Sequence, residues 1–274
     1  MGWAQIASDV VLPQDGSSAS TTILSPTFST SAANELLLAF ISTDYLKGTN
    51  TTVKSVAGGG LTWTLVKRAN AQSGSSEIWG AFSTAQLTGV TVTATLSQSV
   101  ISSMTVMSFA GVNPAKPIGA TAGASAASGA PTASLVTTGA NSWVLGVGND
   151  YDNATARTLG AGQTLIHQDL TSAGDTYWVQ MLSSPVPLSG TTATINDTAP
   201  TKDRYNLAIV EVLAATGATT WSISGTISPA LGGAGATVAL SGTSSAQTTA
   251  DANGNYSFSG LANGSYTVTP SKSG

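Results

Sequence analysis

Two Asp-Tyr pairs are the residues of this chain best suited to bind a ligand. Asp44-Tyr45 and Asp150-Tyr151 each come shortly after an apolar stretch of the chain. Binding residues collect on loops that a rigid β scaffold holds in place. A tyrosine ring can stack on a sugar there, and the neighbouring carboxylate can accept hydrogen bonds from the sugar hydroxyls. We predict a ligand-binding site at these four residues, with local packing of both tyrosines as the alternative.

The second pair also belongs to a run of oxygen ligands. Asp150, Asp152 and Asn153 lie close together where a strand is expected to end. Carboxylate and amide oxygens are the ligands that Ca²⁺ prefers. These three residues therefore form a candidate metal site, with Ca²⁺ as the ion, and no other cofactor is predicted. The similar run 251–255 lacks the spacing of a calcium-binding EF-hand loop, so it favours a hairpin turn.

The residue sets that catalysis needs are missing. His167 is the single histidine, and no Gly-x-Ser-x-Gly turn accompanies it. The chain has no cysteine, which excludes thiolate chemistry and cysteine-bound zinc. Glycoside hydrolysis needs two carboxylates that flank one bond, and the strand that begins at Glu77 supplies one acid where two are needed. The sequence predicts that the protein is not an enzyme.

The composition is that of a weakly charged protein with a proper core. Charged residues are 8% of the chain, against roughly 25% in typical soluble domains, whereas hydrophobic residues are 41%. The net charge is −4, and the nine basic residues are scattered. No cationic stripe can therefore form for nucleic acid or for anionic lipid. The longest apolar run, 36–41, is too short to span a bilayer, so no membrane insertion is expected.

Low charge, abundant Ser and Thr, and the lack of cysteine predict an extracellular protein, secreted or on a bacterial cell surface. The first residues have neither the basic start nor the apolar stretch of a signal peptide. We therefore expect either a mature fragment or a secretion route that leaves no mark at the N-terminus.

The periodicity predicts an all-β fold. Residues 90–96 and 103–109 alternate apolar and polar side chains, as half-buried strands do. Residues 36–41 and 143–147 are continuously apolar, which indicates strands that are buried on both faces. Glycine-rich turns separate the strands, a spacing typical of sandwiches and barrels. Four tryptophans inside strands are expected in the core: Trp63, Trp79, Trp143 and Trp178.

An internal duplication links the two halves of residues 1–215. Residues 33–40 are echoed by 140–147, and both copies then reach Asp-Tyr, a glycine-led strand and an aromatic strand. Two interpretations fit: two separate domains, or two similar halves of one sandwich. We favour one internally duplicated, jelly-roll-type β-sandwich over residues 1–215.

Residues 30–215 also resemble a known extracellular module. The pattern consists of a buried strand after Ala-Asn, then Gly-x-Thr-Trp-Thr, Glu-Ile-Trp, Thr-Val-Thr-x-Thr and a strand that ends in Gly-Val-Asn. It is found here at 33–34, 60–64, 77–79, 91–95 and 111–113. The segment is similar to the laminin-G/concanavalin-like jelly-roll modules of bacterial extracellular proteins. That resemblance implies fold and location and no agreed activity.

A second module is expected after a linker of small residues, 216–220. Residues 221–274 resemble the carboxypeptidase regulatory-like (transthyretin-like) β-sandwich repeat, an Ig-like module of secreted proteins. Such repeats usually continue for another strand or two, so this one is expected to be incomplete. Either the sequence is a piece of a longer protein, or another chain supplies the missing strand by β-addition.

These observations predict an extracellular structural or adhesive module, a fibre or stalk component joined by β-strand addition. Its expected partners are copies of itself or neighbouring modules of the same surface protein. The alternative function is a carbohydrate-binding module without catalytic activity, whose partner is a polysaccharide.

Overall fold

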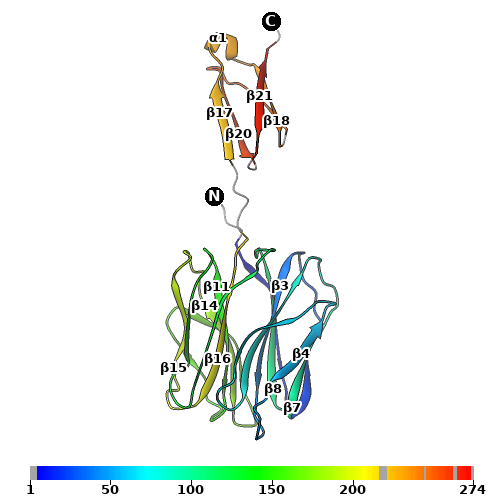
Figure 1. Cartoon of the computed structure of the whole chain (residues 1–274), viewed down its shortest axis with the longest axis vertical. Helices are drawn as coiled ribbons and strands as arrows, with labels where there is room; N and C mark the ends of the chain where they lie inside the picture. The colour runs from blue at the N-terminus through cyan, green and yellow to red at the C-terminus, as the bar shows by residue number, and fades with distance from the viewer. Residues whose placement is uncertain (1–4, 216–220, 244, 262–263, 273–274) are drawn as a thin grey trace. The chain divides into compact units, whose positions relative to one another are not determined.

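The computed structural model describes residues 5–215, 221–243, 245–261 and 264–272. The described residues divide into two compact units, one with residues 5–215 and one with residues 221–272. Each unit is built almost entirely from antiparallel strands, which confirms the predicted all-β class (Figure 1). The predicted linker 216–220 lies outside the described residues.

The first half of the larger unit is an eight-stranded sandwich. Its large sheet has the order β1-β8-β3-β6-β5, and its small sheet has the order β2-β7-β4. This is a jelly-roll order in which the fifth strand has joined the large sheet. The strands are β1 (Ala7–Asp15), β2 (Ser20–Leu24), β3 (Glu35–Thr43), β4 (Val53–Gly58), β5 (Thr64–Ala69), β6 (Ser75–Ser83), β7 (Val92–Val100) and β8 (Ser102–Ala110).

The second half repeats this topology strand for strand. Its sheets have the orders β9-β16-β11-β14-β13 and β10-β15-β12, so each strand corresponds to the one eight places earlier. The predicted duplication is confirmed. The strands are β9 (Ile118–Ala126), β10 (Thr132–Val136), β11 (Trp143–Asp150), β12 (Thr158–Leu159), β13 (Gln163–Leu170), β14 (Thr176–Leu182), β15 (Thr192–Ala199) and β16 (Tyr205–Val212).

The repeated Ala-Asn motif has a local cause. Asn34 and Asn141 precede β3 and β11, and both have a positive φ, 60° and 52°. Among residues with a side chain, asparagine tolerates this left-handed conformation best, because its short amide can hydrogen-bond locally. The same turn therefore leads each half into its central strand.

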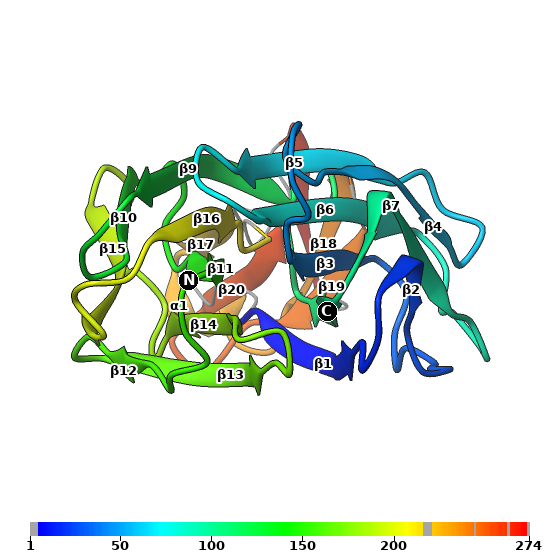
Figure 2. The ribbon, with the colours of Figure 1, turned by 90° about the horizontal axis from the view of Figure 1, so that it is seen from below.

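The unit has four layers, whereas the sequence favoured a single sandwich with two similar halves. Each half is a sandwich in its own right, and the two large sheets pack face to face (Figure 2). Strand β3 shows why a strand between two cores is continuously apolar. Its alternate side chains enter two cores, with Leu37 and Ile41 in the core of the first half and Leu38 and Phe40 in the layer between the halves.

This middle layer is apolar and joins the halves firmly. It buries side chains from both large sheets, among them Met107 and Phe109 of β8 and Leu145 and Val147 of β11. Each fully buried side chain of this size contributes about 1.5–3 kcal/mol. The tryptophans follow the prediction, because Trp63, Trp79 and Trp178 are buried and Trp143 packs against the middle layer.

Polar contacts reinforce the layer at its borders. His167 on β13 lies 2.9 Å from the Asp15 carboxylate on β1. At one end, Asn206 on β16 donates to Ser73 and Gly74 in the loop of the first half and accepts from Gln72. The single histidine is thus a link between the halves, which its sequence context did not indicate.

The smaller unit is also a two-sheet arrangement. Its sheets pair β17 with β20 and place β18 between β19 and β21, around a core that includes Val238, Leu240 and Phe258. The run 251–255 forms a turn, in which the Asp251 carboxylate accepts from two backbone amides. The elements are β17 (Trp221–Thr226), α1 (Ala230–Gly233), β18 (Thr237–Gly242), β19 (Ala246–Thr249), β20 (Asn255–Leu261) and β21 (Tyr266–Ser271).

No helix in the described parts of the chain is long and apolar enough to cross a membrane.

Candidate functional site

The two Asp-Tyr loops meet at one end of the larger unit. They follow β3 and β11, which are equivalent strands of the two halves. The rings of Tyr45 and Tyr151 touch edge to face, with centroids 5.8 Å apart and planes at 71°. Both rings are half-buried. The duplication therefore turns two distant sequence pairs into one aromatic cluster, to which each half contributes a tyrosine.

A cation and its partner extend this cluster. The Arg204 guanidinium lies over the Tyr151 ring, 5.6 Å from its centroid. Arg204 also pairs with Asp152 through a 2.6 Å contact between Nε and Oδ1. Asn153 donates to Asp203, at 3.0 Å between Nδ2 and Oδ1. Aromatic, cationic and anionic groups are thus grouped on an accessible loop surface.

Asp150 does not face this surface, in contrast to its predicted role as a ligand contact. Its side chain is fully buried and forms an ion pair with Arg157. The other carboxylate oxygen accepts from the backbone amides of Asp152 and Asn153. Asp150 therefore shapes the loop that carries Tyr151 and does not itself reach a ligand.

The same contacts explain why the geometry gives no support to the calcium site. Asp150 is occupied by Arg157, Asp152 by Arg204, and Asn153 by Asp203. Among the residues that the structure describes, no group of three or more His, Asp or Glu side chains is placed to hold a metal ion. The calcium site stays a prediction from the sequence, to which these contacts add no support.

Asp44 lies beside a second carboxyl group, Asp175, which belongs to the loop before β14. The two side chains hydrogen-bond. Burial, together with the Asp44 charge, raises the pKa of Asp175 to about 8. Burial also raises the pKa of Asp44, whereas its bonds to the Tyr45 amide and to Asp175 lower it. Tyr177 donates to Asp175 at 2.8 Å. Asp175 is therefore largely protonated at neutral pH.

Sequence reasoning missed Asp175, Tyr177 and Arg204. Asp175 immediately precedes a strand and resembles an ordinary turn residue, and Arg204 is an isolated basic residue in a loop. Their importance comes from partners in other segments of the chain: Asp175 lies beside Asp44 of the other half, and Arg204 pairs with Asp152, 52 residues earlier. The repeat offered one usable signal, since it predicts that the loops after β3 and β11 are equivalent.

Glu77, the acid considered for glycoside hydrolysis, is not accessible. It is fully buried and accepts hydrogen bonds from Arg68 Nε at 2.7 Å, from Trp79 Nε1 at 3.0 Å and from the Val53 amide at 2.8 Å. A catalytic carboxyl must reach its substrate. Glu77 instead stabilises the core of the first half.

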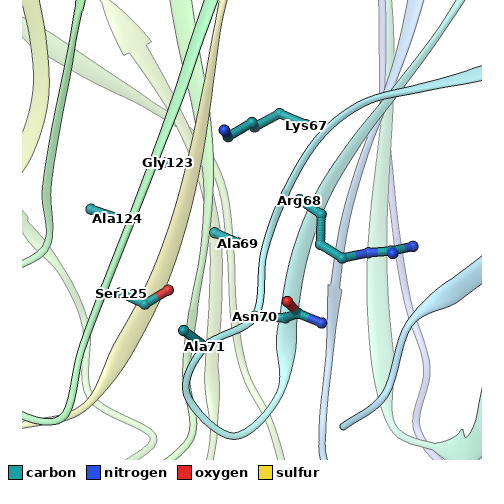
Figure 3. Close-up of a pocket in the computed structure, with 8 residues that line it drawn as sticks. All are labelled: Lys67, Arg68, Ala69, Asn70, Ala71, Gly123, Ala124 and Ser125. Atoms are coloured by element: carbon teal, nitrogen blue, oxygen red, sulfur yellow. The ribbon is translucent and has the colours of Figure 1, made fainter.

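A groove of about 320 Å³ runs between the edge strands β5 and β9 (Figure 3). Residues 67–71 and 123–125 line it. The Lys67 side chain extends across the groove towards β9, whereas Arg68 points away from it and binds Glu77. The volume is at the lower limit for small-molecule sites. No carboxylate lines the groove, so it lacks the acids that hydrolysis would need.

Fold and site together define an all-β protein, with a duplicated jelly-roll unit followed by a small Ig-like unit. Residues 222–274 match the family of carboxypeptidase regulatory-like domains, which confirms the resemblance predicted for the C-terminal module. A domain of this kind is structural and not catalytic. No curated protein and no solved structure matches the chain. The laminin-G-like resemblance of residues 30–215 has no family match and stays a prediction.

Proposed function

We propose that this chain is a structural module of a secreted or cell-surface bacterial protein, and that it associates with other copies of itself along exposed strand edges. The observation that carries the proposal is the character of two equivalent edge strands. β2 and β10 border the small sheets of the two halves, and neither contains a charged residue. Each exposes a large apolar side chain, Leu24 at 54% and Val136 at 56%.

Such edges are templates for strand pairing. Soluble β proteins usually protect an edge strand with lysine, proline or a covering loop. An unprotected edge on each half gives one molecule two attachment points, which is what a linear assembly requires. The low overall charge supports the proposal because it weakens the repulsion between copies. An extracellular location and a non-catalytic role are part of the same proposal.

The test measures association by size-exclusion chromatography with light scattering, followed by electron microscopy. We expect the mass of the native chain to rise with concentration. Leu24→Lys/Val136→Lys places a charge on both edges and should return the chain to a monomer. Leu188→Lys, a change at an exposed loop residue outside the sheets, is the control and should associate like the native chain. A single monomeric species at high concentration would exclude self-association.

A second function, carbohydrate binding, is favoured by the Tyr45–Tyr151 contact. An aromatic cluster beside Arg204 and Asp152 offers ring faces and hydrogen-bonding groups on one surface. These are the groups with which proteins hold sugars.

We expect a glycan array to show binding, and Tyr45→Ala or Tyr151→Ala to weaken it roughly tenfold, equivalent to about 1.4 kcal/mol. Leu188→Ala, which removes an exposed side chain at another position, should keep the native affinity. No binding across the array, or equal binding by all three variants, would reject this function. Circular dichroism should show that each variant is folded.

A further inference from the structure

The second half of the larger unit buries a group of polar atoms that have no partner in the protein. They belong to four side chains between β14, β15 and the segment before β12. Arg157, Trp178, Gln180 and Asp197 are all at least nine-tenths buried, with 8% exposure at most. The unpartnered atoms are Arg157 Nε, Trp178 Nε1, both amide atoms of Gln180 and both carboxylate oxygens of Asp197.

In the first half, the buried polar groups at the equivalent positions have hydrogen-bond partners. The strand registers show which residues correspond: Trp79 pairs with Ala39 and Gln180 with Gly146, and Ala39 and Gly146 each lie five residues after the equivalent Asn34 and Asn141. In the first half, the Trp79 indole donates to Glu77, which Arg68 neutralises. In the second half, Gln180 stands at the position of Trp79 and Trp178 at the position of Glu77, so no carboxylate is present there to accept from the indole.

These atoms require hydrogen-bond partners. A buried polar group without one costs a substantial fraction of a domain's stability, and six such atoms together would cancel most of it. Native proteins satisfy nearly all such groups, with ordered water where no protein atom is available. Arg157 and, more weakly, Gln180 lower the pKa of Asp197, so both side chains lie near it, but no contact between Gln180 and Asp197 has the geometry of a full hydrogen bond.

The donor or acceptor character of these six atoms indicates what kind of molecule can bind among them. Three are donor nitrogens, and three are acceptor oxygens. A cation would face Arg157, and an anion would face Asp150 and Asp197. A small neutral molecule that both donates and accepts suits all six atoms. Because every side chain around the site is buried, the occupant must be small and enclosed.

We propose that the second half of the unit encloses a water-binding site, in which buried water molecules bridge Arg157, Trp178, Gln180 and Asp197. The first half has no corresponding site, because Trp79 and Glu77 stand at the positions of Gln180 and Trp178 and hydrogen-bond to each other. Burial raises the pKa of Asp197 to about 7, so this carboxyl group is protonated in about half of the molecules at neutral pH.

Nuclear Overhauser spectroscopy on the native chain tests the proposal. We expect a cross-peak between the Trp178 indole proton and water, with the sign of the protein's own cross-peaks, which indicates a residence time longer than about a nanosecond. The indole of Trp79, bound to Glu77, is the internal control and should give none. Trp178→Phe assigns the signal by removing it. No water peak at Trp178, or equal peaks at both indoles, would overturn the proposal.

A high-resolution crystal structure of the native chain gives an independent result. We expect isolated density peaks within hydrogen-bond distance of Trp178 Nε1 and of the Asp197 carboxylate. A dry site with direct bonds between the four side chains would overturn the proposal. Density for an ion or an organic molecule at this place would overturn it as well.

Discussion

The larger unit is expected to become less stable as the pH rises from about 5 to about 8. Asp175 and Asp197 are each 2% exposed, and burial raises their pKa values to about 8 and about 7. In the unfolded chain, both return to the ordinary value near 3.8. Between these values the folded state binds more protons than the unfolded state, so raising the pH favours unfolding.

Each carboxyl can change the free energy of unfolding by up to about 1.4 kcal/mol per pH unit inside its window. We expect a total loss of roughly 2–5 kcal/mol in the free energy of unfolding between pH 5 and pH 8. Asp44 and Asp150 act in the same direction, since burial raises their pKa values too. Glu211, whose pKa is lowered, acts only under more acidic conditions.

Thermal and urea unfolding across this pH range give the measurement. The variant Asp175→Asn/Asp197→Asn carries neutral groups of similar shape, so its stability should vary less with pH and should exceed that of the native chain at pH 8. Asp203→Asn changes a partly exposed acid whose charge is the smallest of the causes that act on the Asp150 pKa, so it should alter the native slope only slightly. A native stability that is flat or rises over this range would contradict the prediction.

Removal of Arg157 should destabilise the fold strongly. Its guanidinium pairs with Asp150, and both side chains are almost completely buried, with exposures of 1% and 0%. It also lies 4.7 Å from the centroid of the Trp178 ring. Arg157→Met keeps much of the volume but leaves a buried carboxylate without a counter-ion. Breaking a buried pair in this way costs about 3–5 kcal/mol.

The Arg204–Asp152 pair provides a matched control. Its side chains are 36% and 27% exposed, so water already screens both charges. Exposed pairs are worth roughly 0–1 kcal/mol, and Arg204→Met should cost no more than that. Chemical denaturation of both variants at one pH makes the comparison. Losses of equal size would show that burial does not set the strength of the Arg157–Asp150 pair.

Much of the fold could be predicted from the sequence because its signals are local. Alternation, turns and the repeated motifs indicated the strands and the duplication. The four layers were not predicted, although 36–41 is continuously apolar, as expected of a strand covered on both faces. Which surface covers the second face depends on how the halves pack, and no local pattern encodes that.

The candidate site was predicted only in part. Tyr45 and Tyr151 meet because they lie in equivalent loops of the two halves, after β3 and β11. Asp150 is turned inward by an ion pair with Arg157 of the following loop, a contact that the sequence alone does not indicate. Burial and then the charge of Asp44, which lies in the other half, raise the pKa of Asp175. Both effects depend on tertiary contacts and not on a local sequence pattern.

The first and the last strand residues of the larger unit lie side by side, and this arrangement determines how the unit responds to a pulling force. Ala7 pairs with Ala110, Val112 pairs with Ala214, and the Ala215 amide donates to Gly111 at 2.8 Å. The two ends of the unit are thus tied to one short segment. A pulling force applied between residues 7 and 215 would act on these few hydrogen bonds, and the other strands would carry little of it. A unit connected in this way can keep its fold while the chain that enters and leaves it is pulled.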